Sequence, residues 1–287
     1  MSARWKTRPA VVLAASMLLW AASGLADGEA PASNASFIPH AYSREQMESF
    51  LRTARVVQTR SLSMGVTNSQ KALLDDGSLQ HTAHVQTINV RQTSFQTVKG
   101  TEMNFRDCYM YNMAAYELDK LLDLNMVPVS VERKIRGTGA AVTWWVDDLL
   151  MTNLEKYKKH IQPPDIRKWN QQMLVSRVFD QLIYNTDRNL GNLLICKSWN
   201  IWLIDHTRAF RLYHDLENPS ALVQCDRKLL AKLRELDRAK LTERLGPYLN
   251  KMEIEAILAR RDKIVAFFDQ KIAEKGEAAM LFAMERD

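Results

Sequence analysis

Polar residues interrupt two apolar runs in the stretch Ile183–Ile195, which reads IYNTDRNLGNLLI. Asp187, Arg188 and Asn192 fall there within six residues, and Asn192 begins the mostly apolar run NLLIC. Ionised carboxylates are rarely buried without a partner or a cation. A fold with buried segments on both sides of this turn must therefore provide one for Asp187 or leave the turn exposed to solvent. The pattern predicts a buried helix that leads into a polar turn, and a strand that follows the turn.

A second carboxylate lies a short distance further along the chain. The runs NLLIC and IWLID are separated by residues 197–200 and predict a hairpin that ends at Asp205. Antiparallel pairing would bring Asp187, Asn192 and Asp205 to the same edge of this hairpin. Such oxygen ligands can hold a divalent ion against phosphate oxygens. The alternative is a turn in which Asp and Asn only satisfy local backbone groups.

The order Asp-Arg-x-x-x-Asn, followed by a short hairpin and an Asp, resembles the catalytic and metal-binding loops of the protein-kinase-like superfamily. The resemblance is to the version found in phosphoinositide lipid kinases, HipA-type kinases and secretory-pathway kinases, and the matching residues are Asp187, Arg188, Asn192 and Asp205. It implies a two-lobed α+β fold. A small antiparallel-sheet N-lobe would carry one helix, and the C-lobe would be mostly helical.

The resemblance also implies a role for each matching residue. Asp187 would orient or deprotonate the acceptor hydroxyl, while Asn192 and Asp205 would hold Mg²⁺ or Mn²⁺ on the phosphates of ATP. Arg188 would tie the catalytic loop down or neutralise charge near the metal-binding Asp. The two residues after Asp205 are His-Thr where protein kinases have Phe-Gly, a departure that is familiar among the lipid-kinase relatives.

A kinase N-lobe also needs a lysine on a central strand and usually a carboxylate on the following helix. The predicted strand SFQTVKG places Gln96 where the lysine is expected, and the next helix offers Asn112 near the position of the glutamate. Lys99, three residues after Gln96, is therefore the predicted phosphate contact. A solvated lysine at the end of a strand is the alternative.

The predicted phosphate-covering loop is the segment GVTNS, residues 65–69. Gly65, Thr67 and Ser69 are its candidate nucleotide-binding residues, because backbone amides and hydroxyl groups in a hairpin can cradle phosphate. The segment has one glycine and no Gly-rich triplet, so an ordinary surface turn remains the alternative.

The 287 residues, 46% of them hydrophobic and 25% charged, are enough for one large domain or two lobes. We expect a linker and N-terminal helix over residues 27–60, the N-lobe over residues 61–150 and the helical C-lobe over residues 151–287. Ser43 is the expected N-cap of the first helix. The other expected elements are a hairpin turn at residues 76–77, strands at 84–88 and 94–98, a helix within 109–124, a strand pair around 137–139, and helices at 226–236, 239–245 and 251–275.

The first 26 residues have the order of a secretory signal peptide. Arg4, Lys6 and Arg8 precede an apolar run over residues 10–25, which ends in the small-residue sequence SGLA. This run is shorter than the roughly 20 residues that a spanning helix needs. The sequence therefore predicts an exported protein, which would contact a membrane only if the leader stayed uncleaved.

Charge and cysteine content narrow the function classes. Without the three basic residues of the leader, 36 of the 39 Lys and Arg residues remain against 33 Asp and Glu, and this balance does not predict nucleic-acid binding. Cys108, Cys196 and Cys225 allow at most one disulfide and show no metal-ligand spacing, so we expect them to behave as small buried apolar residues.

Three functions remain open from the sequence. The first is a phosphotransferase that uses ATP and Mg²⁺ or Mn²⁺ and acts on a hydroxyl of a protein or small molecule. The second is a pseudokinase-like module that binds nucleotide or a partner without turnover, which Gln96 and Asn112 favour. The third is an unrelated exported binding protein. Export bears on the choice, because free ATP is scarce outside a bacterial cytoplasm whereas a secretory lumen supplies it.

Overall fold

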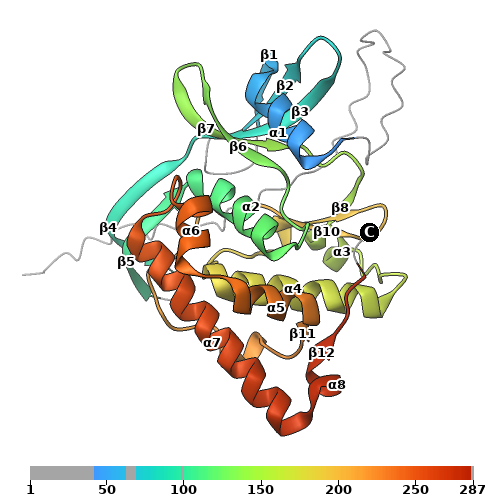
Figure 1. The fold of residues 1–287 in the computed structure, drawn as a ribbon. Helices are drawn as coiled ribbons and strands as arrows, with labels where there is room; N and C mark the ends of the chain where they lie inside the picture. The colour runs from blue at the N-terminus through green and yellow to red at the C-terminus, as the bar shows by residue number, and fades with distance from the viewer. Residues whose placement is uncertain (1–41, 63–68, 98–99, 286–287) are drawn as a thin grey trace, which may run out of the picture.

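An antiparallel five-stranded sheet forms the first half of the protein (Figure 1). The computed structural model describes residues 42–62, 69–97 and 100–285. The strand order is β1-β2-β3-β7-β6, so β3 is the central strand. The strands are β1 (Arg55–Ser61), β2 (Gln70–Asp75), β3 (Gln80–Gln86), β6 (Ser130–Ile135) and β7 (Thr138–Trp144).

The β2–β3 turn confirms the hairpin expected at residues 76–77. One carboxylate oxygen of Asp76 accepts hydrogen bonds from the backbone N–H groups of Ser78 and Leu79, both over 2.8 Å. Gly77 adopts a φ of +91°, a conformation that residues with a Cβ rarely take. The turn therefore depends on an Asp side chain that replaces backbone partners and on a glycine that supplies the left-handed step.

Two helices pack against this sheet. Helix α1 (Arg44–Thr53) starts at a capping box in which Ser43 and Gln46 exchange hydrogen bonds, so the predicted N-cap is confirmed. Helix α2 (Met110–Leu122) is buried along most of its length, because it lies between the sheet and the helical half of the protein (Figure 1). This position makes α2 the element that connects the two halves.

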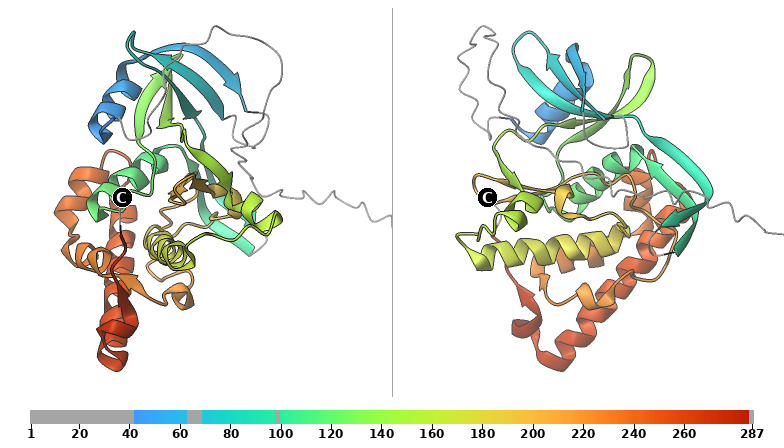
Figure 2. Two further views of the ribbon diagram at one scale, coloured as in Figure 1. Left: turned by 90° about the vertical axis from the view of Figure 1, so that its right-hand side faces the viewer. Right: turned by 180° about the vertical axis from the view of Figure 1, so that it is seen from behind.

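The hairpin β4–β5 is a separate two-stranded sheet, formed by β4 (Asn89–Thr97) and β5 (Gly100–Cys108). It leaves the main sheet after β3 and extends beside helix α7 (Lys251–Lys275), as Figures 1 and 2 both show. Phe95 and Phe105 stack on it with ring centroids 4.0 Å apart. Arg106 anchors it to α7 through an ion pair with Glu253 of 2.8 Å. The hairpin thus separates β3 from α2 by about twenty residues of chain.

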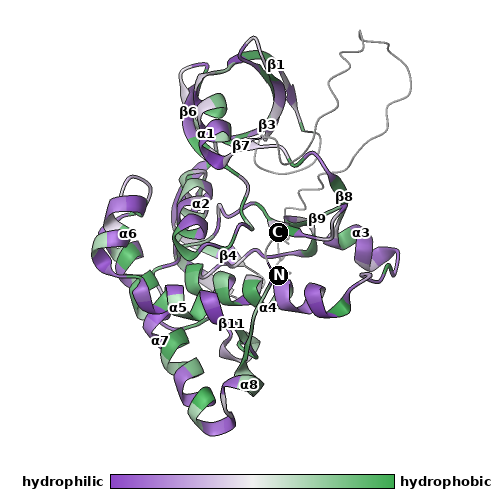
Figure 3. Ribbon diagram, turned by 45° about the vertical axis from the view of Figure 1, so that its right-hand side comes forward, coloured by the Kyte–Doolittle hydropathy of each residue, from purple (hydrophilic) through white to green (hydrophobic). Residues whose placement is uncertain are grey.

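The second half is mostly helical around a short sheet of order β10-β9-β8. Helices α6 and α7 show alternating hydrophilic and hydrophobic stretches (Figure 3), as expected for helices with one buried face. Its elements are β8 (Leu149–Thr152), α3 (Asn153–Lys158), α4 (Ile166–Ile183), η1 (Leu190–Asn192), β9 (Leu193–Cys196), β10 (Ile201–Leu203), η2 (Pro219–Ala221), β11 (Cys225–Asp226), α5 (Arg227–Glu235), α6 (Arg238–Leu245), α7 (Lys251–Lys275), α8 (Glu277–Met280) and β12 (Leu281–Phe282).

A buried arginine fixes the chain that follows the β9–β10 hairpin. Arg260 of α7 is fully buried and donates hydrogen bonds to the backbone carbonyls of Leu182 over 2.8 Å and Arg211 over 2.9 Å. It also donates to the carbonyl of Tyr213. Helices α4 and α7 and the segment after β10 are therefore held together by one side chain, which keeps the end of α4 in a defined position.

The α+β architecture predicted from the sequence is confirmed, with a sheet in the first half and helices in the second. Cys108, Cys196 and Cys225 are buried and free, as expected. Within the described ranges, no helix has the length and apolar character needed to cross a bilayer. The predicted leader, residues 1–26, lies outside the described residues.

Candidate active site

The polar turn at residues 185–189 follows α4 directly. Tyr184 ends the helix in a left-handed conformation with φ +48°, and this reversal sends the chain toward β9. Asn185 is buried, and its side-chain oxygen accepts the N–H of Asp187 over 3.1 Å. The turn is thus fixed by its own amide side chains before any ligand is considered.

Arg188 joins the turn to three other segments. Its Nε donates to the carboxylate of Asp180 over 3.0 Å. Its Nη1 donates to the backbone carbonyls of Asn192 over 2.7 Å and Ile204 over 2.9 Å, and its Nη2 lies 3.0 Å from Nε2 of His206. A planar guanidinium with five donors suits such a junction. The structure therefore places Arg188 where it can tie the loop down.

Asp187 lies on the accessible side of this turn, with its side chain 18% exposed. One carboxylate oxygen accepts a hydrogen bond from Nδ2 of Asn189 over 3.3 Å. The other lies 3.9 Å from Nη1 of Arg208. The carboxylate is thus oriented by two neighbours and still reaches solvent, which an incoming hydroxyl group would require.

Asn192 has the opposite environment, because it is completely buried. Its Nδ2 donates to the backbone carbonyl of Asp187 over 3.0 Å, which fixes the orientation of the amide. Its Oδ1 is buried without a hydrogen-bond partner in the described part of the chain. A buried acceptor that lacks a donor is costly, and a cation would satisfy this oxygen.

Asp205 follows β10 and has a left-handed backbone, with φ +55°. Thr207 Oγ1 donates to its carboxylate over 3.0 Å, and Gln86 Nε2 lies 3.4 Å away. Burial raises the pKa of Asp205 to about 6, and the negative charges of Asp107 and Asp187 contribute to the increase. The site therefore concentrates negative charge that no ion pair of Asp205 within the described ranges neutralises.

These residues fit a hard divalent ion such as Mg²⁺ or Mn²⁺. The free Oδ1 of Asn192 and the carboxylate of Asp205 are both oxygen ligands of the type that such ions prefer. In the described segments, no three His, Cys, Asp or Glu side chains form a metal-binding group by themselves. Phosphate oxygens would have to complete the coordination, as they do where Mg²⁺ is held by one or two carboxylates.

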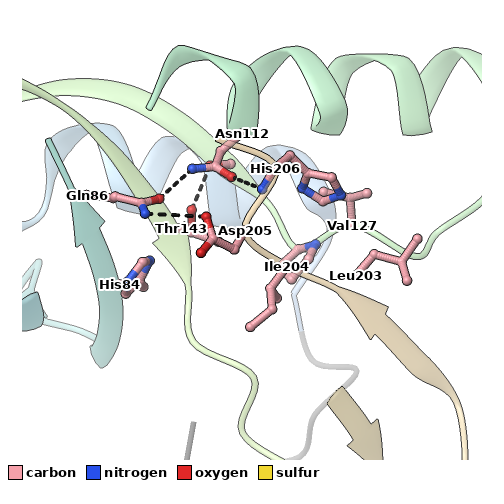
Figure 4. Close-up of a pocket in the computed structure, with 11 residues that line it drawn as sticks. His84, Gln86, Asn112, Val127, Thr143, Leu203, Ile204, Asp205 and His206 are labelled. Atoms are coloured by element: carbon pink, nitrogen blue, oxygen red, sulfur yellow. Dashed lines mark hydrogen bonds between the residues drawn. The ribbon is translucent and has the colours of Figure 1, made fainter. Parts of the chain in front are cut away.

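A neutral amide pair occupies the place expected for the lysine and glutamate. Asn112 of α2 donates from Nδ2 to Oε1 of Gln86, at the end of β3, over 2.8 Å. Oδ1 of Asn112 accepts the backbone N–H of His206 over 2.9 Å. Figure 4 shows these contacts together with that of Gln86 to Asp205. Strand β3 and helix α2 are therefore joined by two neutral amide side chains, and no lysine or glutamate takes part in the contact.

The expected position of Gln96 needs correction, because Gln86 is the residue beside Asn112. Gln96 lies on β4, and its Nε2 donates to Oγ1 of Thr101 across the hairpin over 2.8 Å. The hairpin β4–β5 is inserted between β3 and α2, so counting back from the helix selects the wrong strand. The alternation of His84, Val85 and Gln86 as a half-buried strand was the signal that could have identified Gln86.

The remaining candidate residues lie at or beyond the limits of the described chain. Lys99, Gly65 and Thr67 lie outside the described residues. Ser69 is described: it is buried just before β2, and its backbone carbonyl accepts the N–H of Leu62 over 2.9 Å. This hydrogen bond closes the connection between β1 and β2, which is where the phosphate-covering loop was expected.

A cavity lies between the sheet and the segment after β10. Thr143 of β7 and the apolar side chains of Val127 and Ile204 line part of it. Gln86 and Asp205 form its polar end (Figure 4). Its volume is about 20 Å³, which is room for a single water molecule, so the cavity marks where polar groups of the two halves meet.

The sequence assigned no role to two charged residues that lie near Asp205. Asp107, at the end of β5, is buried, and Arg208 donates to it from Nε over 2.8 Å. Their signal was weak, because Asp107 is distant in sequence and Arg208 lies just after the recognised motif. Arg208 Nη1 lies 3.9 Å from a carboxylate oxygen of Asp187. Asp107 lies close enough to Asp205 for its negative charge to raise the pKa of that carboxyl group.

Several solved structures have a similar fold, among them two of the Golgi casein kinase. Hydra Fam20, solved with a sugar, superposes with a TM-score of 0.62 at 17% identity, covering 84% of this chain and 93% of that one. The Golgi casein kinase with Mn and ADP bound gives 0.59 at 12% identity, covering 85% and 80%. A second structure of the Golgi casein kinase gives 0.57 at 13% identity, covering 84% and 78%.

The protein has a protein-kinase-like fold.

This fold confirms the expectation of a small sheet lobe and a helical lobe. Neither a protein-family model nor a curated protein matches the sequence itself. In this fold, β3, α2 and the end of the β9–β10 hairpin surround the cavity between the two lobes. The fold alone does not assign roles to single residues, which must be argued from their contacts.

Proposed function

We propose that the protein is an exported, metal-dependent phosphotransferase that moves the γ-phosphate of ATP to a hydroxyl group of a protein or small molecule. One observation carries the proposal. The buried Oδ1 of Asn192 has no hydrogen-bond partner in the described part of the chain. The backbone carbonyl of Asn192 accepts the N–H of Ile204, the residue before Asp205, over 3.1 Å. A cation bound here would satisfy both the Oδ1 atom of Asn192 and the carboxylate of Asp205.

The chain's own residues have defined tasks in this reaction. Asp187 accepts the proton of the acceptor hydroxyl while the oxygen attacks the γ-phosphorus, and the bond to the β–γ bridging oxygen breaks to release ADP. Asn192 and Asp205 would hold the divalent ion, which when bound would neutralise phosphate charge. Arg188 keeps the loop in register through Asp180 and the two backbone carbonyls it contacts.

The comparisons support the choice of metal and acceptor class. The Golgi casein kinase structure contains Mn and ADP, which supports a nucleotide with a divalent ion at this site. Hydra Fam20 was solved with a sugar, which supports including sugar hydroxyls, as well as protein hydroxyls, in the acceptor class. The predicted leader supports export, and a secretory lumen would supply the ATP.

One observation favours a second function, the binding of nucleotide without turnover. The Gln86–Asn112 pair lacks the positive charge that a lysine would place on the phosphates. Binding would then depend on the metal and on other cations. Both functions require a nucleotide between the two lobes, so binding is tested first.

The binding test measures the melting temperature of the purified protein with ATP, with and without Mg²⁺ or Mn²⁺. At a nucleotide concentration of about 100 times Kd, we expect a rise of roughly 5 to 10 °C only when metal is present. Asp205→Ala should abolish the metal-dependent part of the rise. Asp215→Ala, at an exposed carboxylate paired with Lys263, is the matched control. No rise in any condition would contradict both functions.

A further inference from the structure

Arg208 faces the carboxylates of the candidate active site. Its Nε donates to Oδ2 of Asp107 over 2.8 Å, and its Nη1 lies 3.9 Å from Oδ2 of Asp187. The side chain is 21% exposed. It is three residues past Asp205 and therefore extends from the same segment as the metal-ligand candidate.

The guanidinium has donors left for a ligand. Arginine carries five N–H donors, and the hydrogen bond to Asp107 is the one that Arg208 donates within the described ranges. Burial disfavours its charged form, but the hydrogen bond to Asp107 and the charges of Asp107, Asp187 and Asp205 together raise the pKa of Arg208. The group therefore remains a cation among three carboxylates.

Its location relates to a particular part of the nucleotide. Under the proposed function, Asp187 faces the acceptor hydroxyl and Asp205 faces the metal that bridges the phosphates. A cation that faces both carboxylates lies where the terminal phosphate would be transferred. A lysine at the position of Gln86 would instead contact the inner phosphates, and that position is neutral here.

We propose that Arg208 binds the terminal phosphate of ATP and supplies, from the segment after β10, positive charge that the neutral Gln86–Asn112 pair does not supply. This inference rests on the proposed function. Asp107 is then a positioning residue, because its carboxylate holds Nε and leaves the other N–H groups of Arg208 available. Arginine suits this role, since its planar fork pairs with two phosphate oxygens at once.

The test compares a diphosphate with a triphosphate by titration calorimetry in the presence of Mg²⁺. Arg208→Gln should weaken binding of a non-hydrolysable ATP analogue at least about tenfold, because a charge-assisted contact to the terminal phosphate is lost. Its affinity for ADP should stay within about twofold of the native value. Arg244→Gln, which removes a surface ion pair with Glu117, is the matched control and should change neither.

A second pair of variants guards against misfolding, because Arg208→Gln leaves the buried Asp107 without its cation. Asp107→Asn keeps a hydrogen-bond acceptor for Nε and should bind the analogue at least as tightly as the native protein. Adding Arg208→Gln to Asp107→Asn should then produce the same selective loss. Equal loss of ADP and analogue affinity, or no loss of either, would overturn the role of Arg208. Failure of the native protein to bind both nucleotides would instead overturn the proposed function, and this inference with it.

Discussion

Asn112 donates a hydrogen bond of 2.8 Å to Gln86, and this neutral contact joins β3 to α2 where a protein kinase would use a lysine and a glutamate. The same Asn112 accepts the backbone N–H of His206. The contact therefore connects the sheet, the helix and the segment that carries Asp205, and it does so without the charges of a lysine and a glutamate.

Replacing the neutral Gln86–Asn112 pair by a lysine and a glutamate should strengthen nucleotide binding. In the double variant Gln86→Lys with Asn112→Glu, the lysine would be paired and would add a charge-assisted contact to the inner phosphates. We expect the affinities for both ATP and ADP to increase about tenfold, as measured by titration calorimetry with Mg²⁺. Gln96→Lys, on the exposed hairpin, is the control and should have no effect. Unchanged affinity in the double variant would show that the pair does not face the phosphates.

Glu253 should be important for stability, because it is buried and joins the hairpin β4–β5 to α7. It pairs with Arg106 over 2.8 Å and accepts a hydrogen bond from the hydroxyl of Tyr111. Glu253→Gln would leave the partly buried Arg106 without its anion, so we expect a loss of about 3 kcal/mol in the free energy of unfolding. Urea denaturation measures this loss.

The control for Glu253 lies two residues further along the same helix. Glu255 pairs with Arg238 on the surface, with exposed fractions of 30% and 58% for the two side chains. Glu255→Gln should therefore cost less than about 1 kcal/mol. Similar losses for Glu253→Gln and Glu255→Gln would contradict the assignment of Glu253 as the hairpin's anchor.

His84 should make the protein less stable in acid. It is buried on β3 between Lys71 and Thr143 of the neighbouring strands, and burial lowers its pKa from 6.5 to about 4. Between these values the unfolded chain binds a proton that the folded protein excludes. The neutral histidine thus contributes stability above pH 6.5, which is lost as the pH falls toward 4.

The size of this effect can be measured from urea unfolding at pH 7 and pH 5. The His84 contribution to the difference should be about 2 kcal/mol, and His84→Leu should remove it. His214→Leu, at an exposed histidine, controls for the loss of an imidazole. An unchanged difference in His84→Leu would show that this side chain is not the one responsible.

The sequence identified the parts of the site that are close together along the chain. Asp187, Asn192 and Asp205 belong to one helix, turn and hairpin, and local periodicity places such an element reliably. Gln86 and Asn112 meet only through tertiary packing, with the β4–β5 hairpin between them. Because the predicted strand at residues 94–98 alternates like a strand of the main sheet, nothing local showed that it belongs to a separate sheet, and Gln96 was chosen in place of Gln86.

Charge pairing across the fold was also beyond sequence reasoning. Asp107 and Arg208 are about a hundred residues apart, and their ion pair depends on the position of the hairpin beside the segment after β10. The same holds for Arg260, which binds the backbone carbonyls of Leu182 and Arg211. A single sequence carries no signal for contacts of this kind.

Metal-dependent turnover of ATP decides whether the protein is a phosphotransferase. With Mg²⁺ or Mn²⁺, the native protein should convert ATP to ADP, with phosphate appearing on an acceptor hydroxyl or in water. Asp187→Asn should keep the nucleotide-dependent rise in melting temperature and lose at least about 100-fold in rate, because the hydroxyl no longer meets a base. Asp215→Asn should match the native rate. Turnover in Asp187→Asn at the native rate, or bound nucleotide without any turnover in the native protein, would contradict the proposed phosphotransferase.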